Sequence, residues 1–286
     1  MTLWLVGIVD AAIVLTIGLA IVLAARRRSA SLLHAVLVAA IVSALLMPVL
    51  EVAVPQVPVI PWGPTASWLS ASTFTSDAAT PVSFDAQPPA PREADVSWMR
   101  LVAALWMGGS ILLGTALIAG FVRLRRLKAR CTPVAGRWRE LTDELRPACG
   151  VARQVALLQS REPSLLITCG LLRPVIILPS ESESWPEARC RAVLRHELAH
   201  IRRHDATVQI VGEILRAVHW VNPLAWVACR RLRQESEYAC DDAVLMSGLE
   251  PAEYATHLID VARQLSGRRA WLSVPARSIP TTPRRR

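Results

Sequence analysis

The first 130 residues contain no cysteine, and the six cysteines that follow are never spaced like the ligand pairs of a zinc knuckle. A cysteine-based metal module is therefore excluded. All six lie between Cys131 and Cys240, and we expect them to remain thiols in a reducing compartment. We predict Cys240 to be a small packing residue rather than a nucleophile.

Basic charge is missing from the opening residues MTLW, and the apolar run behind them is too long for a secretory signal. No recognition-helix or base-stacking signature accompanies the formal net charge of +9, so we expect no direct contact with nucleic acid. Much of the positive charge flanks apolar runs or lies in the terminal Arg284–Arg286. Anionic lipid is its natural partner.

Long apolar runs are what the sequence has in excess. Hydrophobic residues make up 52% of the 286 residues, which is too apolar for an ordinary soluble domain. Three segments are long enough to span a bilayer, at about residues 3–25, 32–54 and 99–122. The sequence predicts an α-helical membrane protein with three transmembrane helices.

The arginines predict how these helices are oriented. Arg26–Arg28 follow the first span and a second basic group starts at Arg123, so the positive-inside rule puts both flanks in the cytoplasm and the amino terminus outside. Residues 55–98 are rich in Pro, Ala, Ser and Thr and are expected to form an extended outer loop. Residues 123–265 then form a cytoplasmic domain, followed by a basic, disordered tail over 266–286. The predicted location is the cell membrane.

The most informative segment is HELAHIRRHD, from His196 to Asp205. His196 and His200 are four residues apart, so on a helix they share one face and can hold one metal ion, with Glu197 available as general base. Ser184 and Glu187 have capping-box spacing, with Pro186 in the first turn, which predicts a helix start just before the motif. The segment predicts a zinc-peptidase centre.

A catalytic zinc needs a third protein ligand. Asn222 and Pro223 resemble an N-cap and first-turn pair that opens a helix carrying two candidates, Glu235 and Glu237. These glutamates lie about 200° apart around the helix, so at most one faces the metal. Asp241, one turn beyond Glu237, can accept the second ring N–H of a histidine ligand, which favours Glu237 over Glu235.

Several motifs together resemble one known family. The stretch from about Val155 to Val261 resembles the cytoplasmic metallopeptidase domain of BlaR/MecR-type membrane sensor-transducers, and its Glu-x-x-x-Asp element is similar to that of HtpX-type and CAAX-prenyl membrane peptidases. The matching motifs are GLLRPVIILP (170–179), HELAHIRRHD (196–205), HWVNPLAW (219–226) and EYACDDAVL (237–245).

The resemblance implies a gluzincin: an α+β zincin-type domain with a small sheet, an HExxH helix and a helix that carries the glutamate ligand. It implies one Zn²⁺ held by His196, His200 and Glu237, with Glu197 as the catalytic base. Asp205 and Asp241 would support the ligands. The implied substrate is a cytoplasmic regulatory protein, such as a winged-helix transcriptional repressor.

Three short β-type runs precede the motif, at Val155–Gln159, Leu165–Thr168 and Val175–Leu178. Prolines bracket the last run, which suits the edge of a sheet and predicts that this strand pairs with an extended substrate. The developing oxyanion needs a second stabiliser besides the metal. His219, Tyr238 and Arg233 are candidates that the sequence does not rank.

Members of the resembled family generally continue into a fourth membrane span, whereas this sequence ends in AWLSVPARSIPTTPRRR. We therefore expect either a short member that works with a separate sensor subunit or a truncated reading frame. Two other functions stay open beside repressor cleavage: a non-catalytic membrane transducer that only binds its partner, and an HtpX-like processing or quality-control peptidase.

Overall fold

The computed structural model describes residues 2–53, 93–161, 166–256 and 259. The predicted tail over 266–286 and most of the predicted outer loop over 55–98 lie outside these residues. The loop prediction is wrong for its last residues, because the chain is helical from Glu93 onward.

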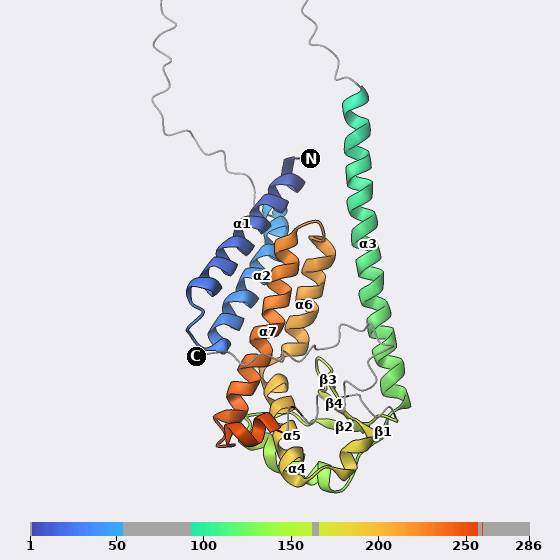
Figure 1. Ribbon diagram of the computed structural model, residues 1–286. Coiled ribbons are helices and arrows are strands. Elements are labelled where there is room, and N and C mark those ends of the chain that lie inside the picture. The colour runs from blue at the N-terminus through green and yellow to red at the C-terminus, as the bar shows by residue number, and fades with distance from the viewer. Residues whose placement is uncertain (1, 54–92, 162–165, 257–258, 260–286) are drawn as a thin grey trace, which may run out of the picture.

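Three helices are long and apolar enough to cross a membrane (Figure 1). They are α1 (Thr2–Ala24), α2 (Ala30–Ala53) and α3 (Glu93–Arg130). The first two agree with the predicted spans to within a few residues, and α3 extends beyond the third span at both ends. α1 and α2 pack closely, since a Cβ on Gly18 would lie 2.5 Å from Cβ of Ala40. α3 continues through its basic flank to Arg130, so the third span and the domain behind it share one helix.

A small mixed sheet follows α3. Its strands are β1 (Thr132–Pro133), β2 (Ala156–Gln159), β3 (Ile167–Cys169) and β4 (Val175–Leu178), in the order β1-β2-β4-β3. β2 and β4 are parallel, while β1 pairs with β2, and β3 with β4, in antiparallel fashion. The β3–β4 turn contains Gly170 at φ +99°, where a Cβ would lie 2.2 Å from the Arg173 carbonyl oxygen.

β4 lies in the interior of the sheet, so its prediction as an edge strand is wrong. Ile176 and Leu178 join the core formed with α4 (Arg137–Ala148) and α5 (Glu187–Arg203). Val175 and Ile177 face a second cluster with Leu124 and Leu127 of α3. Four consecutive buried apolar residues are typical of a strand covered on both faces, and the bracketing prolines limit only its length.

The helix that carries the HExxH motif starts two residues later than a capping box would set it. Ser184 belongs to a 3₁₀ helix (Ser180–Ser184) and its hydroxyl donates to the Glu181 carbonyl, while Pro186 is the N-cap of α5 without a side-chain hydrogen bond. The capping-box prediction is therefore wrong. α5 ends at His204, whose φ of +58° turns the chain directly into α6 (Asp205–Val218).

α6 and α7 (Pro223–Leu245) form a helical hairpin. The predicted N-cap is confirmed, because the Leu224 amide donates to Asn222 Oδ1 at 2.9 Å and Pro223 occupies the first helical position. The hairpin packs against α1 and α2 in one apolar core (Figure 1). Part of the domain predicted over 123–265 therefore lies directly against the apolar helices.

Candidate metal centre

Two crossing helices bring the predicted metal ligands together. His196 and His200 project from one face of α5, and Glu237 comes from α7, which packs against α5. One donor atom from each residue lies within 4.8 Å of the others. Glu237 and His200 are buried, and the His196 side chain is 14% exposed.

The separations between donor atoms fit a single small cation. Nε2 of His196 lies 3.1 Å from Nε2 of His200 and 3.7 Å from Oε2 of Glu237, and Nε2 of His200 lies 3.9 Å from Oε1 of Glu237. With metal–nitrogen distances of about 2.0–2.1 Å, two ligands of a tetrahedral zinc are about 3.3 Å apart. The three side chains therefore have the spacing and donor types of a zinc site.

The other ring nitrogen of each histidine is held by a carboxylate. Nδ1 of His200 lies 2.7 Å from Oδ2 of Asp205, and Nδ1 of His196 lies 3.2 Å from Oδ1 of Asp241. A proton on each Nδ1 leaves the Nε2 lone pairs facing one another at 3.1 Å. A metal ion beside the two Nε2 atoms would accept both lone pairs, and the carboxylates orient both rings for it.

The pKa of His196 also indicates that the cluster favours positive charge. Burial by itself lowers the pKa of His196, but hydrogen bonds with Asp241 and Glu237 and the nearby charge of Glu197 outweigh it and raise the pKa to about 10. The cluster therefore stabilises positive charge at this position.

A second group of possible donors, His200, Asp205 and Cys240, is less suitable for a metal. The 2.7 Å between His200 and Asp205 is a hydrogen-bond distance, shorter than the separation of two ligands on one zinc ion. Cys240 is fully buried, with Sγ 3.2 Å from His200 Nδ1, so it packs against the ligand as the sequence predicts.

Glu197 is 2% exposed and lies between the ligand histidines in sequence. Its Oε2 accepts a short hydrogen bond from the Thr168 hydroxyl of β3. This hydrogen bond links the candidate base to the sheet.

The structure also places the residues that the sequence offered as an alternative metal ligand or as oxyanion stabilisers. Glu235 is buried but lies outside the donor group found among the described residues, so the geometry favours Glu237. His219 follows the end of α6, about 21 Å from Asp205 along the helix, which is too far to reach a reacting carbonyl. Arg233 pairs with Glu213 at 2.8 Å, and Tyr238 is the neighbour of Glu237.

Four residues near the centre were not identified from the sequence: His34, Thr168, Ser236 and Tyr254. The Ser236 hydroxyl donates to Asp205 Oδ2 at 2.7 Å, and the Tyr254 hydroxyl donates to Asp241 Oδ1 at 2.8 Å. Burial and Asp241 raise the pKa of Tyr254, so it remains a donor. Ser236 lies next to Glu237 in the chain, whereas the other three are distant in sequence and carry no motif.

Asp205 also contacts a membrane helix. Nε2 of His34 in α2 lies 3.5 Å from Oδ1 of Asp205, and both side chains are almost fully buried. Nε of Arg203 lies at the same 3.5 Å from this oxygen. Burial raises the pKa of Asp205, but the His200 hydrogen bond and charge, Ser236 and Arg203 outweigh it and hold the pKa below its ordinary value.

Membrane-length helices, combined with a His/His/Glu cluster formed by an HExxH helix and a second helix, are typical of a membrane peptidase with a metal site. The chain belongs to the family described as BlaR1 peptidase M56, whose sequence pattern matches residues 1–284. This establishes a membrane protein of a peptidase family.

Two relatives give the scale of the similarity. The chain is 39% identical over 88 residues to the regulatory protein BlaR1 of Bacillus licheniformis, a match that covers 30% of this chain and 15% of that protein. It is 26% identical over 77 residues to the methicillin resistance MecR1 protein of Staphylococcus aureus (strain Mu50), covering 27% of this chain and 13% of that protein. The match thus spans a small part of both relatives.

Proposed function

We propose that this chain is a membrane-anchored zinc endopeptidase of the gluzincin type. His196, His200 and Glu237 are the metal ligands, Glu197 is the general base, and Asp205 and Asp241 orient the two histidines. The observation that carries the proposal is the facing pair of Nε2 atoms at 3.1 Å, with carboxylates on both Nδ1 atoms and Glu237 beside them. The family membership supports peptide hydrolysis as the reaction.

A zinc ion bound to these residues supplies Lewis-acid activation of water and of the scissile carbonyl. Glu197 accepts the proton of the attacking water and returns it to the leaving amine. Asp205 and Asp241 fix the ring orientations, and a carboxylate on Nδ1 raises the basicity of Nε2. The hydroxyl of Thr168 holds the Glu197 carboxylate in position until substrate enters.

The substrate strand is reassigned from β4 to β3. β3 pairs only with β4 among the strands of the described residues, and through Thr168 it touches the candidate base. An extended peptide added along the outer edge of β3 would pass next to Glu197, with main-chain hydrogen bonds supplying sequence-tolerant affinity.

The proposed orientation puts the metal centre on the cytoplasmic side of the cell membrane, because Arg26–Arg28 and the basic end of α3 both lie at its end of the helices. We further propose a cytoplasmic regulatory protein as substrate, of the winged-helix repressor type. The support is the similarity to a protein named as regulatory, BlaR1.

The test combines metal content with cleavage by the full chain in lipid vesicles. The probes are unfolded casein and any winged-helix repressor encoded beside this gene. The wild type should hold one zinc and cleave, while Glu197→Gln should keep its zinc and lose at least 100-fold in rate. Glu187→Gln, an exposed change on the same helix, is the matched control.

Two outcomes would overturn the proposal. A wild-type chain that binds no zinc leaves only a non-catalytic transducer. Cleavage that persists in Glu197→Gln removes the proposed base.

A further inference from the structure

The α6–α7 hairpin lies among the apolar helices rather than below them (Figure 1). Its buried residues share one core with Leu15 of α1 and with Leu37 and Ile41 of α2. On the opposite side the hairpin meets α3: Trp106 Nε1 donates to the Val218 carbonyl at 3.0 Å, and Trp220 Nε1 donates to the Trp106 carbonyl at 3.1 Å.

The depth of the hairpin tip can be measured along two helices. Trp106 lies seventeen residues before Arg123 in α3, which corresponds to about 25 Å of helix. On the α1 side the tip reaches Ile8, eighteen residues before Arg26, or about 27 Å. The hydrocarbon core of a bilayer is about 30 Å thick. If the arginines mark one membrane surface, the tip reaches well past the middle.

The sequence of the tip suits that depth. Residues 217–229 form an uncharged, largely apolar run bounded by Arg216 and Arg230, and a run of this length is typical of a re-entrant segment rather than a full span. Large apolar side chains are exposed around the tip: Val221 is 62% exposed, Val227 47% and Trp226 40%.

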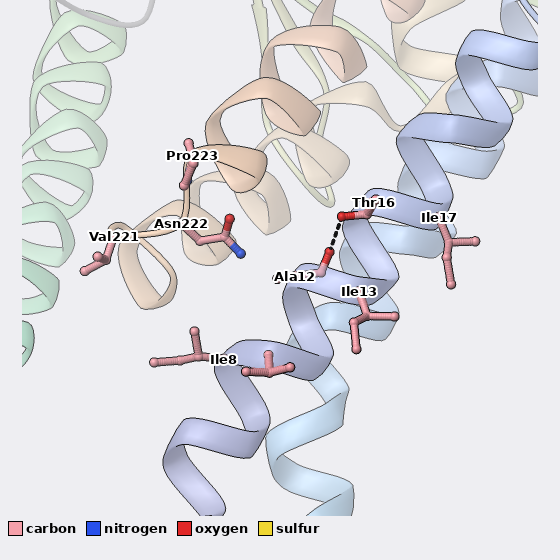
Figure 2. A pocket seen from close by; sticks show the side chains of 9 residues that line it. Ile8, Ala12, Ile13, Thr16, Ile17, Val221, Asn222 and Pro223 are labelled. Atoms are coloured by element: carbon pink, nitrogen blue, oxygen red, sulfur yellow. Dashed lines mark hydrogen bonds between the residues drawn. The ribbon is translucent and has the colours of Figure 1, made fainter.

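A groove between the tip and α1 has a volume of about 480 Å³ (Figure 2). Ile8, Ala12, Ile13 and Ile17 line it from α1, and Val221 and Pro223 line it from the tip. The α1 wall belongs to a candidate membrane span, so the groove continues a lipid-facing surface. Its size and apolar lining fit an acyl chain.

The backbone groups of the turn make hydrogen bonds within the protein, as a lipid environment requires. The His219 amide donates to the Leu215 carbonyl at 2.8 Å, and the Asn222 amide donates to the His219 carbonyl at 2.9 Å. Trp226 Nε1 donates a hydrogen bond to the Trp220 carbonyl at 2.9 Å. The backbone of the turn is therefore hydrogen-bonded without water, whereas both ring nitrogens of His219 and Nδ2 of Asn222 are buried without a hydrogen-bond partner among the described residues.

Two arginines behind the tip share one carboxylate, while Arg230 and Arg231, at the edge of the tip on α7, are exposed. Arg216 and Arg233 both contact the Glu213 carboxylate, at 2.9 and 2.8 Å, and the Arg216 guanidinium lies 4.0 Å from the centre of the Trp226 ring. Charges at membrane depth are typically paired in this way.

We propose that α6 and α7 form a re-entrant membrane hairpin whose tip, residues 217–229, contacts lipid acyl chains. This surface is separate from the metal centre and independent of catalysis. Its occupant is lipid, because its apolar wall is continuous with the lipid-facing side of α1.

The test is photolabelling of the full chain in phosphatidylcholine vesicles that contain a phosphatidylcholine with a mid-chain diazirine. Trypsin releases the tip as residues 217–230, the lipid-exposed part of α3 as 101–123, and a water-exposed reference as 140–153. We expect lipid adducts on 217–230 at a level comparable to 101–123 and at least tenfold above 140–153.

Labelling of 217–230 no higher than that of 140–153 overturns the proposal, and so does a tip that crosslinks to a second copy of the chain in place of lipid. A pair of variants provides a second measurement. Val221→Asp should lower the melting temperature in vesicles, whereas Met246→Asp, an 88% exposed site at the other end of α7, should not. Equal melting temperatures would count against a lipid-facing tip.

Discussion

Asp205 contacts several side chains around the centre. It accepts from His200 and Ser236 through Oδ2 and faces His34 and Arg203 through Oδ1. Replacing it with asparagine keeps an acceptor of the same shape and removes the charge that makes His200 a stronger ligand. We expect Asp205→Asn to weaken zinc binding by about 10–100-fold, measured by competition with a chelator.

The control for this variant is Asp143→Asn, an exposed carboxylate on α4 that pairs with Arg139, one helical turn before it, at 3.3 Å. It should bind zinc as the wild type does. Equal affinities for Asp205→Asn and the wild type would mean that Asp205 does not act on the metal.

Asp205 also predicts how stability depends on pH in the metal-free protein. Its folded-state pKa is lowered, so the folded state favours the charged carboxylate more than the unfolded state does. The stabilisation is present above the unfolded pKa of about 3.9 and is lost as pH falls through the lower folded value. The melting temperatures of wild type and Asp205→Asn, measured with chelator present, should therefore converge as the pH drops from 7 towards 3.

The sequence was sufficient for residues that lie in one motif. His196, Glu197 and His200 follow from helical spacing, and Glu237 and Asp241 from a helix whose N-cap was recognisable. Thr168, Tyr254 and His34 reach the same centre from a strand, a later helical turn and a membrane helix. Their approach depends on tertiary packing, which no local pattern encodes.

At the scale of elements, β3 is the strand that we propose pairs with the substrate. Thr168→Val removes the hydroxyl that holds Glu197 and preserves a β-branched side chain on the strand. We expect this variant to keep its zinc and to cleave roughly tenfold more slowly, as judged by metal content and cleavage rate. Thr142→Val, on α4, is the control for loss of a hydroxyl bonded elsewhere. Unchanged cleavage by Thr168→Val would remove Thr168 from the mechanism.

A proline placed in β4 would not test substrate binding. Ile176 and Ile177 are fully buried in an interior strand, so proline at either position would disrupt pairing with a neighbour and lower stability. β2, β3 and β4 were predictable from apolar runs, but the two-residue strand β1 was not predicted. Strand order was not predictable either, since it depends on how α3 and α5 cover the two faces of the sheet.

The span limits of the apolar helices were predictable to within a few residues, except that α3 begins earlier and continues as one helix to Arg130. The break between α5 and α6 was not predicted. It depends on a single residue, His204, in the left-handed conformation, which no glycine signals.

At the scale of the whole molecule, the metal centre is joined to the membrane through α2. His34 Nε2 and Asp205 Oδ1 are buried and 3.5 Å apart, and Asp205 in turn holds His200. We expect His34→Ala to weaken zinc binding several-fold in vesicles, measured by chelator competition. Leu46→Ala, at an exposed site on the same helix, should bind zinc normally. Identical affinities for both variants would mean that α2 has no influence on the metal.

The core shared by α1, α2, α6 and α7 also constrains how this protein is made. Glu237 is delivered by a helix whose first half packs against the first two apolar helices, so these must be in place before the ligand set is complete. A water-soluble fragment from residue 123 onward would expose Leu215, Ala225 and Leu232, and we expect it to aggregate. During synthesis, metal loading would then be a late event that follows insertion into the bilayer.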